Sequence, residues 1–403
     1  MIFLNLKIIQ KIINSKKIVG IYEDINIVNI KTNSKEIKEG DLFLTINSGY
    51  LYIEDAISNG ASAIITDVDN LTYDIPTLVV DNTKKALKSL ASYYRSQYKG
   101  IVIAITGSNG KTTTKELLKY VLSKKNKVLA NDESKNNILG VSNTLLNLSN
   151  NYDYLILELG MNHKGEISEL SNLVKPDIGI ITNIGTSHIG YLGSQDNIFK
   201  AKLELLDGNP NMKLFVNGSD KYLKGVSATK VEPVNLFNHL HPISTSIVLT
   251  IYKYLGYDEE TAEELMKNFS GVKSRMQHYY IKDHLVIDDA YNASYESFVN
   301  GLENLKQYDN RKIIIFGDML ELGKYSTYYH QKVLDKVKEL DNVIIITVGT
   351  ETAILNNVYH FYELELLKNF FKNFNWYDDD IVYMKASHKI NLSSIIPFFE
   401  DLW

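Results

Sequence analysis

The chain has 403 residues, 44% of them hydrophobic and 23% charged, which is typical of a globular protein with two or three compact units. Its formal net charge of -5 disfavours a nucleic-acid-binding protein, because phosphate contacts need a surplus of lysine and arginine. The absence of cysteine excludes disulfides, thiolate metal sites and a cysteine nucleophile.

The N-terminal segment is apolar but is interrupted by Lys7 and Lys11, and it lacks a small-residue cleavage site. This pattern predicts an amphipathic opening element and not a secretion signal. No apolar run is long enough to cross a bilayer, so we expect a soluble protein of the cytoplasm without membrane insertion.

Short apolar strands alternate with longer amphipathic helices, which predicts an α/β protein with mainly parallel sheets. In the first unit we expect strands at 41–46, 63–66 and 77–80 and a helix at 53–59. In the second we expect strands at 101–105, 154–159, 178–181 and 214–216 and helices at 111–122, 166–174 and 196–206. In the third, which begins near Gly271, we expect strands at 285–287, 312–316, 343–348 and 382–384 and helices at 296–307 and 328–340.

The strongest functional signal is the loop at residues 106–113, Thr-Gly-Ser-Asn-Gly-Lys-Thr-Thr, between a predicted strand and a predicted helix. Glycines let successive backbone N–H groups turn toward phosphate oxygens, and the helix N-terminus favours an anion. Lys111 supplies a cation and Thr112 a hydroxyl for magnesium. Ile105 stands where the general phosphate-loop pattern has its first glycine, and an ordinary strand–helix turn is the competing interpretation. The context favours a nucleotide-phosphate site.

Polar side chains follow two further strands. Glu158 comes at the end of the strand at 154–159, and His188 closes the segment 182–188 after the next strand. Because parallel strands present their carboxyl ends at one edge of a sheet, we expect both residues near the phosphate loop, where a carboxylate can hold Mg²⁺. A solvent-facing glutamate and a structural histidine are the alternatives. Lys202 lies on the next predicted helix, and by pattern alone it is a surface lysine.

The third unit has Arg275 near its start and polar loops after two of its strands, at 288–294 and 317–323. Such loops suit a closing lid or an acceptor site. A polar strand-to-helix turn with Ser294 as the helix cap is the competing explanation.

Taken together, these segments resemble the Mur ligases. The resemblance rests on motifs that occur in the family's order between about residues 30 and 390. They are 105–113, Asn136-Asn137 with Gly140, 157–167, 183–189, 193–194 leading into 201–204, 288–294 and 317–323.

The resemblance implies a fold and a reaction. The fold is a UDP-sugar-recognition domain at 1–83, a central ATP-binding domain with a phosphate-loop-type parallel sheet at 84–271, and a Rossmann-like domain at 272–403. The reaction is amide-bond formation that adds D-Ala-D-Ala to a UDP-linked muramoyl tripeptide through an acyl phosphate, in peptidoglycan precursor synthesis. The enzyme would need ATP and two Mg²⁺ ions. It would be a monomer.

The resemblance also implies residue roles. Lys111, Glu158, His188 and Lys202 would be catalytic, with Thr112, Glu158, His188 and Lys202 holding magnesium and Lys202 carrying a carbamate. Nucleotide contacts would come from Gly107, Ser108, Asn109, Gly110, Lys111, Thr112, Thr113, Arg275, Asp289 and Asn292. Substrate contacts would come from Ser34, Lys35, Asn162, His163 and Lys385.

Four segments depart from the family pattern. At the usual His-Asn-x-x-Asn, the sequence from His241 to Thr245 replaces both asparagines, so the resemblance does not predict how adenine is held. Residues 32–35 and 47–53 lack the usual UDP-sugar motifs, and Lys-Ala-Ser-His at 385–388 replaces Lys-Gly-Ser-Arg. These departures leave two alternatives: a related ligase acting on another UDP-linked or peptide carboxylate, and a nucleotide-binding scaffold without ligase activity.

Overall fold

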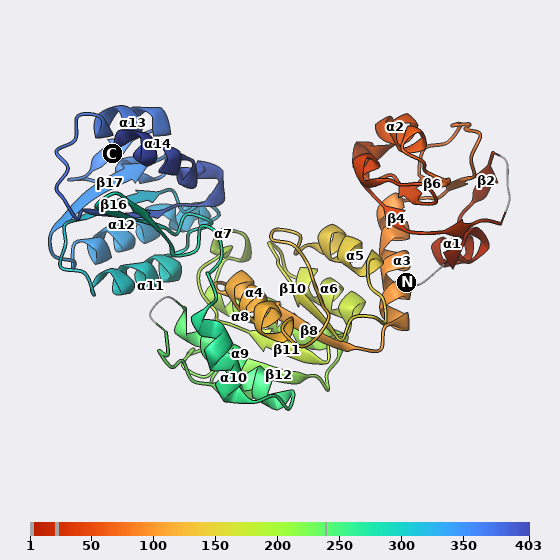
Figure 1. Cartoon of the computed structure of the whole chain (residues 1–403), viewed down its shortest axis with the longest axis horizontal. Coiled ribbons are helices and arrows are strands. Elements are labelled where there is room, and N and C mark those ends of the chain that lie inside the picture. Colours follow the sequence, from red (N-terminus) through yellow and green to blue (C-terminus); the bar gives the residue numbers. More distant parts are fainter. Residues whose placement is uncertain (1–3, 21–23, 238–239) are drawn as a thin grey trace.

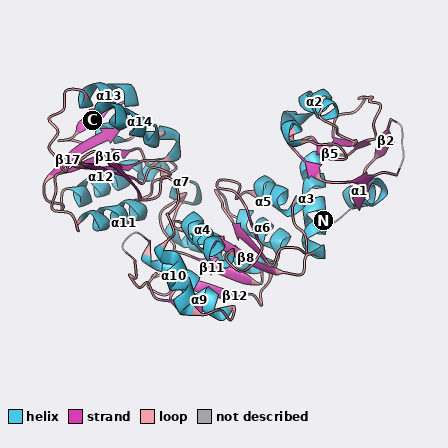
Figure 2. Cartoon of the chain, in the orientation of Figure 1, coloured by secondary structure: helices cyan, strands magenta, loops and turns pink. Residues whose placement is uncertain are grey.

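The computed structural model describes residues 4–20, 24–237 and 240–403. Over these residues the chain forms three units arranged as an open crescent, with the N-terminal unit at one tip and the C-terminal unit at the other (Figure 1). Each unit has a sheet accompanied by helices (Figure 2). The predicted α/β class with mainly parallel sheets is confirmed.

The N-terminal unit is built on a small sheet. In spatial order its strands are β2 (Lys17–Val19), β7 (Thr77–Val79), β6 (Ala63–Thr66), β5 (Leu42–Leu44) and β4 (Ile30–Lys31). Its other elements are β1 (Leu4–Asn5) paired with β3 (Asn26–Ile27), α1 (Leu6–Ile13), α2 (Ile53–Ser58) and the 3-10 turns η1 (Ser34–Glu36) and η2 (Asn47–Tyr52). The predicted amphipathic opening element is α1, which buries Leu6, Ile9 and Ile13. Residues 1–3 of that prediction lie outside the described residues.

A long helix, α3 (Thr83–Gln97), links the first unit to the central one (Figure 1). Its buried side chains recur on one face, at Thr83, Ala86, Leu87, Leu90, Ala91 and Tyr94. This face packs on α1 of the first unit and on α5 (Ile138–Leu146) of the central unit. Helix α3 therefore packs against both the first unit and the central unit.

The central unit has a parallel sheet with the order β13 (Thr229–Val231), β12 (Lys213–Asn217), β11 (Ile178–Ile181), β8 (Ile101–Thr106), β10 (Tyr154–Glu158) and β9 (Val128–Ala130). Its other helices are α4 (Lys111–Leu122), α6 (Glu166–Val174), α7 (Ile189–Leu192), α8 (Gln195–Leu203), η3 (Glu204–Gly208), α9 (Pro242–Tyr254) and α10 (Glu259–Lys267). Glu158 pairs in register with Ile105, and Ile181 with Thr106. These three strands therefore end at the same edge of the sheet.

The C-terminal unit has a second large sheet, ordered β14 (Gln277–Ile281), β15 (His284–Asp288), β19 (Ile381–Lys385), β16 (Lys312–Gly317), β17 (Val343–Val348) and β18 (Tyr359–Phe361). Only the pairing of β14 with β15 is antiparallel among these described strands. Its helices are α11 (Tyr295–Leu305), η4 (Gly323–Tyr325), α12 (Ser326–Val337), η5 (Thr352–Ile354), α13 (Leu364–Phe371), η6 (His388–Ile390), η7 (Leu392–Ile395) and α14 (Ile396–Leu402). Helices α11 and α12 lie on one face of the sheet and α13 and α14 on the other (Figure 1).

Most predicted elements occur within a few residues of their predicted limits. The helix predicted at 196–206 ends earlier as an α-helix, because α8 gives way to η3 after Leu203. Several elements were not predicted, among them the short strands β1–β4, strands β9, β13, β14 and β18, and helices α3, α5, α7, α9, α10, α13 and α14. Among the described residues, no helix combines the length and the apolar character needed to cross a membrane.

Candidate active site

The phosphate loop connects β8 to α4 and depends on glycine at two positions. Gly107 has φ 148°, and a Cβ atom there would lie 1.9 Å from Oγ1 of Thr182. Gly110 has φ 79° and is the N-cap residue of α4, where a left-handed backbone favours glycine. The loop therefore curls tightly against the end of β11 and leaves the helix N-terminus open toward the cavity.

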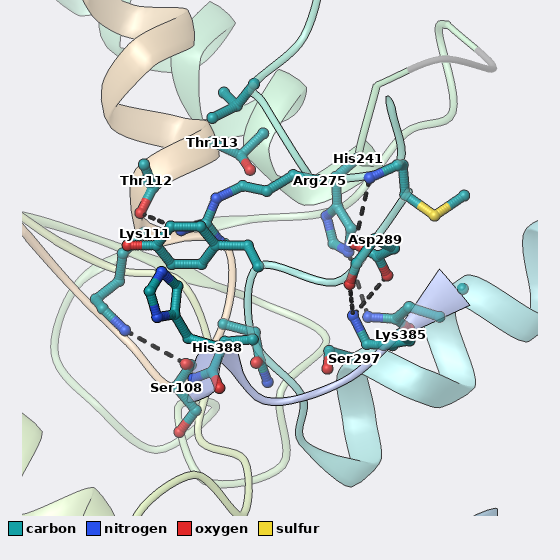
Figure 3. Close-up of a pocket in the computed structure, with 18 of the residues that line it drawn as sticks. Ser108, Lys111, Thr112, Thr113, His241, Arg275, Asp289, Ser297, Lys385 and His388 are labelled. Carbon is teal, nitrogen blue, oxygen red and sulfur yellow. Dashed lines mark hydrogen bonds and ion pairs between the residues drawn. The ribbon is translucent and has the colours of Figure 1, made fainter. Parts of the chain in front are cut away.

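Lys111 lies over this loop. Its Nζ atom donates a hydrogen bond of 2.8 Å to the carbonyl oxygen of Gly107. It also donates one of 3.3 Å to the carbonyl oxygen of Ser108 (Figure 3). Burial lowers the pKa of Lys111 below its ordinary value, although the nearby Glu158 carboxylate opposes this shift. The ammonium group is thus held by the backbone of the loop whose phosphate ligand it was predicted to contact.

Glu158, at the end of β10, is 4% exposed and has both carboxylate oxygens engaged. Oε2 accepts a hydrogen bond of 2.7 Å from the Thr112 hydroxyl, and Oε1 accepts one of 2.9 Å from the Asn136 amide. Burial favours a raised pKa, but the charge of Lys111 and these hydrogen bonds outweigh it and hold the pKa of Glu158 below its usual value. Glu158 is therefore ionised, as a magnesium ligand must be.

Two residues behind Glu158 fix its backbone. The Asn131 side chain accepts from the Glu158 N–H and donates to the Glu158 carbonyl, both at 2.9 Å. The Asn131 carbonyl in turn accepts a 2.6 Å hydrogen bond from Nζ of Lys115, which is fully buried and also pairs with Glu116 at 2.9 Å. Neither Asn131 nor Lys115 belongs to a motif with a recognisable spacing, so their roles cannot be predicted from the sequence.

His188 follows the loop after β11 and has a left-handed backbone, with φ 65°. Its Nδ1 atom lies 2.7 Å from Oε2 of Glu321, which belongs to the C-terminal unit. The two atoms are at ion-pair distance, although their arrangement is not that of a directed hydrogen bond. Among the described residues, no group of three or more His, Cys, Asp or Glu side chains is arranged to hold a metal.

Lys202 is buried, with an exposed fraction of 2%, so the surface position suggested by its local pattern is wrong. It lies on α8, and burial, with a smaller contribution from the charge of Lys111, lowers its pKa well below the ordinary value. A lowered pKa makes the neutral, nucleophilic form of the amine more accessible than it is in an exposed lysine.

The C-terminal unit contributes a second group of side chains. Arg275 extends across the cavity, and its Nη2 atom donates a 2.8 Å hydrogen bond to Oγ1 of Thr112 (Figure 3). Its guanidinium carbon stacks 3.9 Å above the Tyr291 ring. On the other side of the cavity, Nζ of Lys385 contacts Oδ2 of Asp289 at 2.5 Å. Asp289 and Lys385 thus form a buried ion pair.

These residues line one cavity of about 880 Å³ at the junction of the central and C-terminal units. The predicted site residues that line it are Ser108, Asn109, Gly110, Lys111, Thr112, Thr113, Glu158, Asn162, His188, Arg275, Asp289, Asn292 and Lys385. Gly107, His163 and Lys202 are not among the lining residues, and Ser34 and Lys35 lie in the distant N-terminal unit. The structure thus brings together most of the nucleotide and metal candidates, without Gly107 and Lys202, and only part of the predicted substrate set.

The cavity lining also includes apolar and amide side chains. The apolar ones are Leu240, Ile243, Phe269 and Val272 of the central unit, and the amides are Asn300, Asn304 and Gln307 of the C-terminal unit. Nε2 of His241 lies 3.3 Å from Nδ2 of Asn300, and burial lowers the pKa of His241. The amides of Asn300, Asn304 and Gln307 were not predicted, since they carry no motif.

The donor set fits magnesium. A threonine hydroxyl and an ionised carboxylate meet beside a phosphate loop, and Mg²⁺ binds through one or two such oxygens together with substrate phosphates. A parallel sheet, a phosphate loop at its carboxyl edge and a second sheet unit closing over the cavity define a class: nucleotide-dependent enzymes that transfer a phosphoryl group.

Comparison with known proteins narrows this class. Residues 105–239 match the model of the Mur ligase middle domain, and residues 274–365 match that of the Mur ligase glutamate ligase domain. The chain is 31% identical to UDP-N-acetylmuramoyl-tripeptide–D-alanyl-D-alanine ligase of Rickettsia prowazekii, over 95% of this chain and 97% of that protein. The chain belongs to the Mur ligase family.

Solved structures show the same fold over nearly the whole chain. MurF from Acinetobacter baumannii superposes with a TM-score of 0.85 and 26% identity, covering 98% of both chains. MurF from Thermotoga maritima, solved in complex with ADP, superposes with a TM-score of 0.82 and 23% identity, covering 93% of this chain and 97% of that one. The three-unit architecture is therefore that of MurF.

Proposed function

We propose that this protein is the ligase that joins D-Ala-D-Ala to a UDP-N-acetylmuramoyl-tripeptide, with hydrolysis of ATP to ADP and phosphate, in peptidoglycan precursor synthesis. The full-length similarity to relatives of that name supports the substrates. The observation that carries the chemistry is the meeting of Lys111, Thr112 and Glu158 beside the phosphate loop.

The reaction begins with a poor acyl donor, since a carboxylate has no usable leaving group. A carboxylate oxygen attacks the γ-phosphorus of ATP, and the bond between that phosphorus and the β-phosphate oxygen breaks. ADP departs, and the carboxylate has become an acyl phosphate. The amine of D-Ala-D-Ala then attacks the acyl carbon, loses a proton, and expels phosphate to form the amide. Both steps build negative charge on phosphate oxygens.

Residues of this chain would stabilise the negative charge on the phosphate oxygens. The loop amides and the N-terminus of α4 face the phosphates, and Lys111 supplies a mobile cation within the same loop. Thr112 and Glu158 would hold magnesium, which neutralises phosphate charge when it is bound. Arg275, Asp289 and Asn292 would contact the nucleotide from the C-terminal unit, which would also exclude water from the acyl phosphate.

Lys111→Ala tests this assignment in a phosphate-release assay with UDP-N-acetylmuramoyl-tripeptide, D-Ala-D-Ala and ATP. Removing one electrostatic donor to the developing charge should lower kcat by about 10²- to 10³-fold. Lys119→Ala is the matched control, because Lys119 is an exposed lysine of the same helix. Undiminished activity in Lys111→Ala would contradict the assignment. If the wild-type protein is active only with another carboxylate–amine pair, it is a related ligase. If it has no ligase activity with any pair, it is a nucleotide-binding scaffold.

His188 and Lys202 complete the proposed site. His188 would contact a second magnesium ion, and the neutral amine of Lys202 would add to CO₂, giving a carbamate and releasing a proton. The burial of Lys202, its lowered pKa and its position near Lys111 support this modification. Protein equilibrated with ¹³C-bicarbonate should show a carbamate ¹³C signal that is absent from Lys202→Met, and an identical spectrum in both proteins would exclude it.

The remaining assignments stay predictions. They are the domain limits 1–83, 84–271 and 272–403, the cytoplasmic location, the monomeric state, and the substrate contacts of Ser34, Lys35, Asn162, His163 and Lys385. The N-terminal unit, for which the resemblance implies a UDP-sugar role, lies at the far tip of the crescent from the C-terminal unit (Figure 1).

A further inference from the structure

Residues of the C-terminal unit contact the loop that carries His188, which belongs to the central unit. Glu296, in the first turn of α11, accepts two hydrogen bonds from Thr186: one from the backbone N–H at 3.0 Å and one from the hydroxyl at 2.8 Å. Gly185 leaves room for this carboxylate, because a Cβ atom there would lie 2.8 Å from Oε2 of Glu296. Glu296 therefore docks into the loop immediately before His188.

A second contact from the C-terminal unit lies immediately after His188. The Glu321 carbonyl accepts a 3.0 Å hydrogen bond from the Gly190 N–H, while its carboxylate lies 2.7 Å from Nδ1 of His188. A Cβ atom at Gly190 would lie 2.5 Å from the Glu321 carbonyl oxygen and 2.8 Å from the Gly323 nitrogen. The two backbones thus approach as closely as glycine permits.

The two residues that face each other here both have a left-handed backbone, with φ 65° at His188 and φ 70° at Glu321. Histidine is one of the residue types found more often in this region, whereas glutamate adopts it rarely. At Glu321 the conformation costs about 1–3 kcal/mol and persists because surrounding contacts enforce it. The backbone of Glu321 is therefore held in an unfavourable conformation where its carboxylate lies beside His188.

We propose that Glu321, assisted by Glu296, is a positioning residue that orients the His188 imidazole when the C-terminal unit docks onto the central unit. This inference rests on the proposed function for the role of His188 at a metal. A carboxylate beside Nδ1 favours the tautomer with its proton there and leaves the Nε2 lone pair free for a ligand. Docking of the C-terminal unit would thereby complete the metal site.

The inference can be tested by Mn²⁺ binding, followed by electron paramagnetic resonance with a non-hydrolysable ATP analogue and without the peptide substrates. Glu321→Ala should weaken one bound Mn²⁺ by about 10-fold, the lower end of the range for losing an outer-shell partner of a metal-bound histidine. Coordination by a histidine nitrogen also modulates the Mn²⁺ signal. This modulation should become weaker in Glu321→Ala. Glu321→Gln, which keeps an oxygen beside Nδ1, should recover part of both.

Three comparisons make the test decisive. Glu365→Gln, an exposed glutamate of α13 in the same unit, should behave as wild type. His188→Ala should lose the same Mn²⁺, and the double variant Glu321→Ala with His188→Ala should lose no more, because both changes remove one interaction. Additive losses, or unchanged affinity and nitrogen modulation in Glu321→Ala, would overturn the inference. Wild-type protein that binds Mn²⁺ but ligates nothing would overturn the proposed function alone.

Discussion

Arg275 and Thr112 belong to different units of the fold, and the guanidinium Nη2 of Arg275 donates a 2.8 Å hydrogen bond to the Thr112 hydroxyl. That hydroxyl uses its own proton in the bond to Glu158, so Arg275 takes one of its lone pairs. A cation of the C-terminal unit therefore reaches the predicted magnesium ligands of the central unit. The predicted nucleotide site is therefore shared between the two units.

Arg275→Lys should weaken ATP binding although it keeps the positive charge. Lysine lacks the planar guanidinium group that donates to Thr112 and stacks over Tyr291, so it cannot replace both contacts. We expect the KM for ATP to rise about 10-fold, the equivalent of one charge-assisted hydrogen bond. Lys273→Arg, a change at an exposed neighbouring residue, serves as the control in the same kinetic assay. An unaltered KM in Arg275→Lys would remove Arg275 from the nucleotide site.

Gly107→Ala should abolish nucleotide binding. The new methyl group would collide with Oγ1 of Thr182 at 1.9 Å, and the backbone at φ 148° is unsuited to alanine, so the loop must open. The free energy of unfolding should fall by about 1–3 kcal/mol. Gly225→Ala is the matched control, because nothing lies within 4 Å of the added atom. Calorimetric titration with an ATP analogue and thermal unfolding measure the two effects, and binding equal to wild type would contradict the predicted loop geometry.

Lys202→Met should stabilise the protein in a pH-dependent way when CO₂ is excluded. Burial lowers the pKa of Lys202 well below 10.5, so the unfolded chain binds more protons there than the folded one. Wild-type stability is therefore lost as the pH falls from 10.5 toward the folded pKa. The Tm advantage of the variant should be larger at about pH 6 than at about pH 9.

Lys200→Met provides the comparison for this measurement, because Lys200 is an exposed lysine of the same helix. It should show no such pH-dependent advantage. Equal pH profiles for wild type and Lys202→Met would mean that Lys202 keeps its proton in the folded protein.

Asn131→Ala should weaken both folding and metal binding. The change leaves the buried N–H and carbonyl groups of Glu158 without their partners, which costs about 1–3 kcal/mol. Glu158 would then be held less firmly, so the apparent affinity for Mg²⁺ in the phosphate-release assay should also fall. Asn172→Ala, at an exposed position, should leave both unchanged. A variant with lowered stability but a normal Mg²⁺ dependence would show that Asn131 serves folding only.

The nucleotide part of the site was predictable because its signals are local. The strand, the glycine loop and the helix that begins at Lys111 follow each other within a few residues, and alternation of strands with helices indicates a parallel sheet. The end of β10 then places Glu158 at the same edge, as its register with Ile105 shows. The residue pattern itself predicted magnesium contacts for Thr112 and Glu158, whereas the catalytic roles and the metal role of Lys202 came from the family resemblance. All of these roles stay predictions.

Other parts of the fold have weaker local signals. Helix α3 was missed although its buried residues recur on one face, because its mean composition is polar and its partners α1 and α5 lie far away along the chain. Lys202 was taken for a surface residue because the charged residues around it hide its burial.

By itself, the sequence determined the class of fold, the position of the phosphate loop and the order of the three units, because these depend on residue spacing and hydrophobic periodicity. The tertiary structure alone decided which side chains meet across the junction: Arg275 with Thr112, Glu296 with Thr186, and Glu321 with His188. Each of these pairs joins residues more than 100 positions apart. Their contacts depend on how two sheets dock, which is set by the packing of many side chains and leaves no regular spacing along the chain.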